Sequence, residues 1–232
     1  MIRLLKNLLR PTKQKIYSLL NIGEPPPHIP VIPPIGTEDL FQNSVPSYSL
    51  FNLSDTYGEP NLNELVTIAK VISYFKPKLV FEIGTFEGGT TSHIAVNTPK
   101  QSKIYTLDLG EENIKEVWDK TLDVYPYKTG VRFIDSYFED KITQLLGDSQ
   151  TFDFSDYHGI IDLVFVDACH HYDHVKKDSE NAFKMIRPGG VILWHDYASY
   201  APGVMKVLDE ISAERKLLQI KDTSLVIFKN DH

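Results

Sequence analysis

The chain has 232 residues, a mass of 26.5 kDa and a formal net charge of −7, with 42% hydrophobic and 24% charged residues. This size and composition predict one soluble domain with an extension, and no second core is required. The single cysteine, Cys169, excludes an internal disulfide and a zinc site built from thiolates, so a reducing cytoplasm is the expected compartment.

Residues 1–20 form a basic amphipathic segment that contrasts with the acidic remainder. They hold five basic residues and no acidic one, which leaves 19 of the 24 basic residues against all 31 acidic residues elsewhere. An acidic body is a poor nucleic-acid surface, so no nucleic-acid partner is expected. The segment fits a weak contact with an anionic membrane or a partner, or a frayed terminus that contacts a second copy in a homo-oligomer. It lacks the apolar run and cleavage site of a signal peptide, and no stretch of the chain is apolar enough to span a bilayer.

Residues 21–60 predict an extended, proline-rich arm. Six prolines fall between Pro25 and Pro34, a composition typical of a semi-rigid connector. The aromatic residues of its later part indicate either a lid over a pocket or simple packing on the body. These residues are Phe41, Tyr48, Phe51 and Tyr57.

The predicted globular domain covers residues 61–232. Asn61 followed by Glu64 is typical of a helix start, and helices and strands then alternate. Strands are predicted at 79–83, 103–108, 131–134, 161–166, 190–195, 216–220 and 224–229, and helices at 88–97, 111–120, 138–146, 172–186 and 202–214. Uninterrupted apolar strands need cover on both faces, and the last two strands have only a short connector. The predicted fold class is therefore α/β: a Rossmann-like, doubly wound, mostly parallel seven-stranded sheet with an antiparallel edge strand.

The turn after the first strand of this domain carries the most specific chemistry. Gly84, Gly88 and Gly89 let a ligand approach the backbone and the first amides of the next helix. The spacing G-x-x-x-G-G lacks both the lysine of a phosphate loop and the G-x-G-x-x-G of a dinucleotide site. Glu82 and Glu87 would repel a pyrophosphate but suit a ligand with an amino group and a sulfonium. This chemistry indicates S-adenosylmethionine.

Polar residues at the ends of the following strands extend this site, because ligands of open α/β sheets bind at the carboxyl ends of the strands. Asp108 lies about 20 residues beyond the glycine turn, where a carboxylate accepts both ribose hydroxyls. NAD-binding proteins share this spacing. Asp135 and Ser136 follow the next predicted strand and fit either a contact with adenine or a local turn.

Potential ligands also gather after the strand that ends at Asp167. His170, His171 and His174 follow within a turn or two. His171 and His174 are expected on the solvent face of a new helix, and Cys169 is expected to be buried rather than nucleophilic.

His195 and Asp196 stand at the end of predicted strand 190–195. Together with Asp167 they predict a site of oxygen and imidazole ligands for Mg or Mn, with iron or zinc less favoured.

Four segments, taken in order, resemble a known family. They are Phe-Glu-Ile-Gly-Thr-Phe-Glu-Gly-Gly-Thr (81–90), Leu-Asp-Leu (107–109), Val-Asp-Ala-Cys-His-His-Tyr-Asp-His-Val-Lys-Lys-Asp (166–178) and Arg-Pro-Gly-Gly-Val-Ile-Leu-Trp-His-Asp-Tyr (187–197). The combination is similar to class I S-adenosylmethionine-dependent methyltransferases. It resembles most the bacterial branch with macrolide-sugar and cephalosporin-tailoring O-methyltransferases, and more distantly the catechol and caffeoyl-CoA enzymes. The resemblance covers about residues 61–229.

The resemblance implies roles for the candidate residues. It implies cofactor contacts at Glu82, Gly84, Glu87 and Asp108, an adenine near Ser136, metal ligands at Asp167 and Asp196, and a base at His170. The residues themselves add Gly88 and Asp167 as cofactor contacts, His195 as a third metal ligand, and His195 as the base of a metal-free alternative. Relatives commonly have an acidic residue where this chain has His195, which leaves the metal and the need for one open.

The expected function is O-methyl transfer from S-adenosylmethionine to a hydroxyl of a small polar molecule such as a sugar or glycan precursor, helped by a base and by Mg or Mn. An NAD-linked oxidoreductase shares the fold, but the missing G-x-G-x-x-G and Glu87 disfavour it. A non-catalytic adaptor that retains the cofactor is the other alternative.

Overall fold

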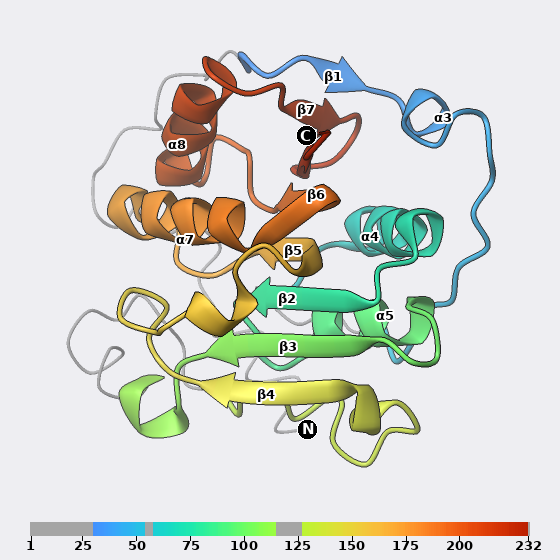
Figure 1. Ribbon diagram of the computed structural model, residues 1–232, viewed down its shortest axis with the longest axis vertical. Helices are drawn as coiled ribbons and strands as arrows, with labels where there is room; N and C mark the ends of the chain where they lie inside the picture. Colours follow the sequence, from blue (N-terminus) through green and yellow to red (C-terminus); the bar gives the residue numbers. More distant parts are fainter. Residues whose placement is uncertain (1–29, 54–57, 115–126, 232) are drawn as a thin grey trace, which may run out of the picture. The chain divides into compact units, whose positions relative to one another are not determined.

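The computed structural model describes residues 30–53, 58–114 and 127–231 (Figure 1). The predicted amphipathic segment 1–20 and the first part of the arm lie outside these residues. Within them, no helix combines the length and apolar character needed to cross a membrane.

The described strands form one eight-stranded sheet in the order β1-β7-β8-β6-β5-β2-β3-β4. They are β1 (Pro34–Ile35), β2 (Leu79–Ile83), β3 (Lys103–Asp108), β4 (Ile142–Leu146), β5 (Ile161–Val166), β6 (Ile186–Trp194), β7 (Leu218–Ile220) and β8 (Val226–Lys229). All neighbours pair in parallel except β8, which is antiparallel to both β6 and β7. The predicted α/β class is confirmed. The sheet differs from the expected one in having β1 as an eighth strand. Its antiparallel strand, β8, lies between β7 and β6 and not at the edge of the sheet.

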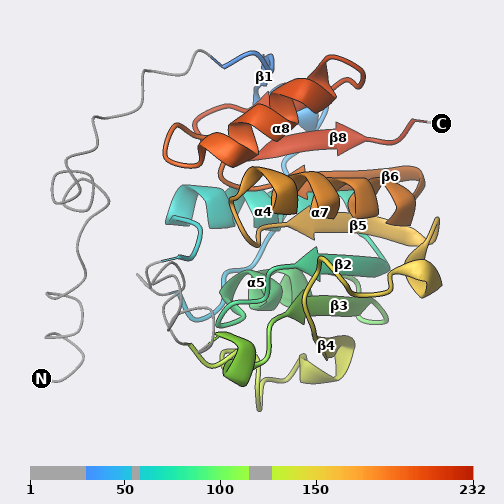
Figure 2. The ribbon, with the colours of Figure 1, turned by 90° about the vertical axis from the view of Figure 1, so that its left-hand side faces the viewer.

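Helices cover both faces of this sheet, as the doubly wound class requires. The helices are α3 (Thr37–Leu40), α4 (Leu62–Phe75), α5 (Gly89–Asn97), α7 (Tyr172–Met185) and α8 (Pro202–Ser212), with short 3-10 turns η1 (Glu139–Lys141) and η2 (Ser155–Tyr157). Figure 2 shows α7 and α8 on one face and α4 and α5 on the other. Each face has its own hydrophobic cluster, because the strands alternate side chains between the two faces.

Most predicted elements are found within four residues of their expected ends, but the segment between β3 and β5 is not. The predicted strand 131–134 is a turn, and the predicted helix 138–146 is η1 followed by β4. The apolar spacing of Phe138, Ile142 and Leu145 is helical, yet β4 pairs with β3 along its whole length. Parallel pairing at the sheet edge therefore overrides the local periodicity. Of the predicted helix 111–120, residues 111–114 are helical and the rest lies outside the described residues.

The compact unit that contains the sheet begins at Val31, thirty residues before the expected boundary at residue 61. Ile32 and Phe41 are 1% and 2% exposed, and β1 pairs with β7. Phe41 packs against Tyr74, and Phe51 packs edge-on against Phe138. Residues 31–53 therefore pack onto the body, which is the simpler of the two alternatives considered for the arm.

Candidate functional site

The glycine turn between β2 and α5 is held against the ends of both neighbouring strands. The amide of Gly84 donates to the carbonyl of Leu107, the penultimate residue of β3, at 2.9 Å. Gly84 has φ of +103°, and a Cβ at this position would overlap the backbone carbonyl oxygen of Asp167. Only glycine fits this conformation and this close approach. The turn is thus fixed beside the carboxyl end of β5.

Gly88 begins α5 in the left-handed region, with φ of +87°. A Cβ on Gly88 would lie 2.7 Å from the ring of Phe133. The amides of the first turn of α5 have no partner within the helix, and the positive end of its dipole lies at the glycine turn. These features make the start of α5 suitable for the carboxylate or another polar group of a ligand.

Glu82 is the fourth residue of β2, two positions before Gly84 of the turn. Its side chain is fully buried, and its Oε2 accepts hydrogen bonds from Thr91 and Thr106 at 2.5 Å each. Burial raises the pKa of Glu82 to about 8, although these two hydrogen bonds oppose the shift. The carboxyl is therefore mainly protonated at neutral pH. Through Oε2, Glu82 links the start of α5 to β3, whereas its Oε1 is buried and has no hydrogen-bond partner among the described residues. The expected contact of Glu82 with the cofactor stays a prediction.

Asp108 ends β3 with its carboxylate turned toward the glycine turn. Its Oδ2 accepts from the Phe86 amide at 2.6 Å, and its Oδ1 accepts from the Leu109 amide at 2.7 Å and the Tyr127 hydroxyl at 2.8 Å. Burial raises the pKa of Asp108, while these hydrogen bonds hold it down. The residue stands where the sequence predicted, and Tyr127 is a neighbour that the sequence did not indicate.

Residues 58–60 close over the glycine turn. The Glu59 carboxylate forms an ion pair with Arg132 and lies where a Cβ on Gly89 would be. The amide of Arg132 in turn donates to the carbonyl of Glu87 at 2.9 Å. The remaining space beside Gly84 and Asp167 is a cavity of about 20 Å³. It holds about one water molecule.

A second constellation lies at the ends of β5 and β6, around the buried ring of His195. Its Nε2 is 3.1 Å from Oε2 of Glu64, and its Nδ1 is 3.1 Å from Oδ1 of Asp167 and 3.3 Å from Oδ1 of Asp196. Burial alone would lower the pKa of His195, but the charge and hydrogen bond of Asp167 and the hydrogen bonds of the other two carboxylates raise it well above the usual value. His195 is therefore an imidazolium that donates from both ring nitrogens. Both ring nitrogens of His195 face carboxylates in this arrangement, and its expected roles as base and as metal ligand stay predictions.

Asp196 connects this buried cluster to the surface. Its backbone is in the left-handed region with φ of 64°, because β6 has ended at Trp194. Its Oδ2 is 2.6 Å from Nε2 of His170, and its Oδ1 accepts from the hydroxyl of Tyr200 at 2.5 Å. Burial would raise the pKa of Asp196, but hydrogen bonds from His170 and His195 hold it far below the usual range. His170, with 40% of its side chain exposed, gives a ligand access to this group.

The three side chains that lie close enough together to bind one cation are Asp167, His170 and Asp196. The expected set contained His195 where this one contains His170. One potential ligand atom each of Asp167, His170 and Asp196 lie within 4.8 Å of one another. Ser136 precedes η1 and β4, and its buried hydroxyl has no hydrogen-bond partner in the described part of the chain, so its contact with adenine stays a prediction. Gly147 and Asp148 follow β4 at the ligand edge, where the Gly147 amide donates to the Asp108 carbonyl at 2.9 Å.

Three charged residues of the site were not identified from the sequence as functional. Glu64 was recognised only as a capping residue, which it is, since Asn61 and Glu64 form a reciprocal capping box. Its Oε1 also accepts from Ser224, and its Oε2 meets His195, so one carboxylate serves the helix start and the site. Glu59 and Arg132 gave no local signal, because they are 73 positions apart and meet only in the fold.

Comparison with known proteins identifies the family. The family described as "Methyltransferase domain" matches residues 81–197, which is just over half of the chain. The chain belongs to this methyltransferase family. The match extends from within β2 to the residue after Asp196. It covers the glycine turn, Asp108, Asp167 and His195, but not Glu59 or Glu64.

More distant likenesses agree with this methyltransferase fold. An O-methyltransferase from Streptomyces achromogenes, TomG, involved in tomaymycin synthesis and solved in complex with SAM, is 16% identical over 74% of this chain and 82% of that one, with a TM-score of 0.54. Two other solved structures are similar to the same extent. A putative O-methyltransferase from Klebsiella pneumoniae is 17% identical over 75% of this chain and 83% of that one, with a TM-score of 0.56. An O-methyltransferase from Bacillus cereus in complex with SAH is 16% identical over 75% of this chain and 83% of that one, with a TM-score of 0.55.

One curated relative is an uncharacterized protein of Acanthamoeba polyphaga mimivirus, 31% identical over 139 residues. The alignment spans 57% of this methyltransferase and 58% of the relative's own length.

The residues of the methyltransferase fit the cofactor that its family implies, provided that residues 58–60 move. The glycine turn, the start of α5 and Asp108 offer the backbone and carboxylate groups that a nucleoside with an amino acid tail requires. A cavity of about 20 Å³ is far below the roughly 300 Å³ of a small-molecule pocket. In this structure the Glu59 carboxylate takes up the space beside Gly89 at the start of α5.

The donor set also fits a divalent cation. Glu64, Asp167 and Asp196 bring three carboxylates to one imidazolium, so the cluster keeps an excess of negative charge. Two carboxylates and one imidazole suit Mg, Mn, iron or zinc.

Proposed function

We propose that the chain is an S-adenosylmethionine-dependent O-methyltransferase acting on a hydroxyl of a small polar molecule, with a sugar or glycan precursor as the expected acceptor class. The observation that carries this proposal is the contact between the two constellations. The glycine turn that would hold the methyl donor touches the backbone of Asp167, which also belongs to the acid and histidine cluster. Donor and acceptor groups would therefore lie side by side, as in-line transfer requires.

The acceptor side of the site has the groups needed to bind and deprotonate a hydroxyl. His170 is the proposed base, and Asp196 orients its ring through the 2.6 Å contact. The His195 ring lies 3.1 Å from Asp167 and 3.3 Å from Asp196 and holds both carboxylates in place. The Tyr200 hydroxyl and the carboxylates favour a hydroxyl-rich acceptor over an apolar one.

A divalent cation held by Asp167, His170 and Asp196 would lower the pKa of the acceptor hydroxyl when bound. In that case His170 serves as a ligand, and without the cation it serves as the base. The solved O-methyltransferases with SAM and SAH support the choice of donor, and the shared family argues against the NAD-linked alternative.

Two variants test the assignment of the two sides. Asp108→Asn is expected to weaken S-adenosylmethionine binding by roughly 1 to 3 kcal/mol in calorimetry, because it unpairs a buried polar group. Asp196→Asn is expected to leave this affinity nearly unchanged but to lower methyl transfer by roughly 10²- to 10⁴-fold, the usual contribution of a positioned base. Asp153→Asn, an exposed aspartate away from the site, is the control for both readouts.

The acceptor for the turnover assay is found by mass spectrometry, as a species that gains one methyl group in the presence of the protein. Equal affinity for NAD, or full activity of Asp196→Asn, would refute the proposal. Binding of S-adenosylmethionine without transfer to any acceptor of a broad panel would favour the adaptor alternative. Loss of activity on chelation and its return with Mg or Mn would support the metal-assisted mechanism. Full activity in metal-free protein would support a mechanism in which His170 acts as the base without a metal.

A further inference from the structure

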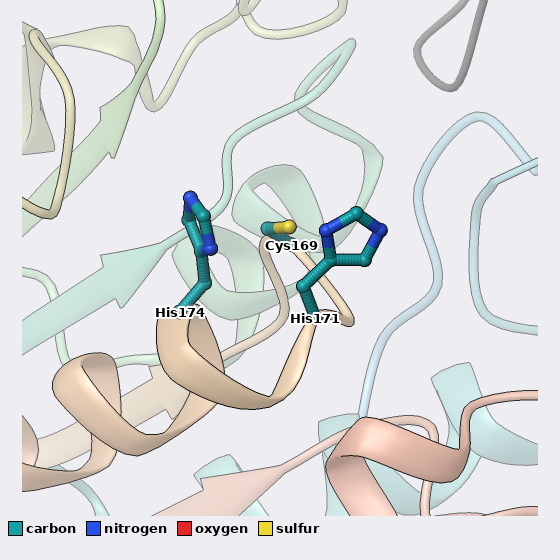
Figure 3. A group of neighbouring side chains, drawn as sticks. All are labelled: Cys169, His171 and His174. Carbon is teal, nitrogen blue, oxygen red and sulfur yellow. The ribbon is translucent and has the colours of Figure 1, made fainter. Parts of the chain in front are cut away.

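A second group of potential metal ligands lies in the segment that joins β5 to α7. Cys169, His171 and His174 each offer one ligand atom, and these atoms lie within 4.8 Å of one another. Figure 3 shows the Cys169 thiol between the two imidazole rings, with both rings on the same side of the first turn of α7. The group shares no residue with Asp167, His170 and Asp196.

Local helix geometry brings these three side chains together. His171 is the N-cap of α7, with an extended backbone, and His174 is the third residue of the helix. Residues three apart at a helix start lie on the same face. Cys169 precedes the cap by two positions, and it lies at the surface instead of being buried as expected. His170, between them in sequence, is directed to Asp196 instead.

The contacts of the two histidines do not account for this arrangement. Their ring centroids are 6.2 Å apart at an interplanar angle of 82°, so the rings are not stacked. Nδ1 of His174 is buried, and nothing in the described part of the chain hydrogen-bonds to it. A buried ring nitrogen without a partner is uncommon, and a ligand that accepts its lone pair would explain it.

The donor set selects the ligand. One sulfur and two imidazole nitrogens are typical of zinc and unlike the oxygen ligands of magnesium or calcium. Tetrahedral zinc places such ligand atoms about 3.3 to 3.7 Å apart. Side-chain rotations that move each ligand atom by about 1 Å would bring the three atoms to these distances. The positive end of α7 opposes a cation, but the thiolate cancels one charge, and the helix effect is small beside the strength of thiolate and imidazole bonds to zinc.

We propose that Cys169, His171 and His174 bind one Zn²⁺ ion, with a fourth position open to water or an exogenous ligand. A zinc ion here would fasten the segment that follows Asp167 and carries His170 to the first turn of α7. It would thus hold the acceptor side of the site in place without contacting the acceptor cluster itself.

Cobalt is the spectroscopic probe, because a thiolate bound to Co²⁺ gives a charge-transfer band in the near ultraviolet that oxygen and nitrogen ligands do not give. The full chain, without a histidine tag and stripped of metal, is titrated with CoCl₂ and then with ZnCl₂. We expect the band to saturate at one equivalent and to be abolished by one equivalent of zinc. We expect Cys169→Ser to lose the band and His174→Ala to bind zinc at least tenfold more weakly.

Two controls separate this site from other ligands. His158→Ala removes an exposed histidine elsewhere and should behave as the parent chain. Asp196→Asn alters the acceptor cluster and should keep the cobalt band. Zinc should also raise the thermal midpoint of the parent chain but not that of Cys169→Ser, since a ligand stabilises only a fold that binds it. An absent band in the folded parent chain, or an unchanged band in Cys169→Ser, would overturn the proposal.

Discussion

Two glycines of this chain share a left-handed backbone but are glycine for different reasons. Gly84 and Gly159 have φ of +103° and +69°. Gly159 lies in open space, with nothing within 4 Å of the position of a Cβ, whereas the same atom on Gly84 would overlap the Asp167 backbone. At Gly159 only backbone strain disfavours a side chain. At Gly84 the contact between the glycine turn and β5 disfavours it as well.

We expect Gly84→Ala to lower the free energy of unfolding by roughly 3 kcal/mol or more, because strain and steric overlap add. Gly159→Ala is the matched control and should cost only about 1 kcal/mol, since strain acts alone. Denaturant unfolding of both variants measures the difference. Equal losses would show that the turn is not held against β5.

Helix α4 is the element that joins the fold to the acceptor cluster. Its third residue, Glu64, caps the helix, accepts from the Ser224 amide at 2.9 Å and meets His195 at 3.1 Å. Hydrogen bonds from His195 and Ser224 outweigh burial and lower the pKa of Glu64 to about 2, so it is ionised at all ordinary pH values. The start of α4 is thus tied to the ends of β6 and β8 by a single carboxylate.

Glu64→Gln is expected to destabilise the protein by about 3 kcal/mol or more, because it leaves a buried imidazolium with one charge partner fewer. Asp173→Asn, at an exposed acidic position in the first turn of α7, is the control and should cost about 0.5 kcal/mol, the usual helix-dipole effect. Chemical denaturation at neutral pH gives both values. A loss at Glu64 no larger than at Asp173 would contradict a structural link through this residue.

At the scale of the whole molecule, the compact unit begins at Val31 and not at residue 61. The side chains of Ile32 and Phe41 are almost fully buried, Ile32 in the cluster of α7 and α8 and Phe41 in that of α4 and α5. The hydroxyl of Tyr197 accepts from the amide of Val31 at 3.2 Å. Residues from Val31 onward therefore contribute to both sides of the core.

We expect removal of residues 1–20 to leave thermal unfolding and cofactor binding nearly unchanged, because the described core starts at Ile32. A longer deletion, of residues 1–42, removes two buried side chains and should cost roughly 5 kcal/mol or more. Calorimetric unfolding of both truncated chains checks this boundary. If the shorter deletion unfolded the protein or abolished cofactor binding, the first segment would belong to the functional fold.

The sequence by itself determined the alternation of elements, the glycine turn and the residues at the ends of β2, β3, β5 and β6. These signals are local: an apolar strand, a turn that only glycine adopts, and a polar residue where the strand ends. A sheet with helices on both faces follows from them, because parallel strands need covering helices. For the same reason Asp108, Asp167 and Asp196 lie at one edge of the sheet, as expected.

Only the tertiary structure decided which of these side chains meet and in what state. Burial raises the pKa of Glu82, whereas the three carboxylates around His195 raise the pKa of its ring against the effect of burial. The strand β4 exists because β3 offers it a partner, although its apolar spacing is helical. Contacts such as Glu59 with Arg132 join residues far apart in the chain, and no local pattern encodes them. Local sequence sets backbone geometry, whereas burial and charge at a site depend on every segment that folds around it.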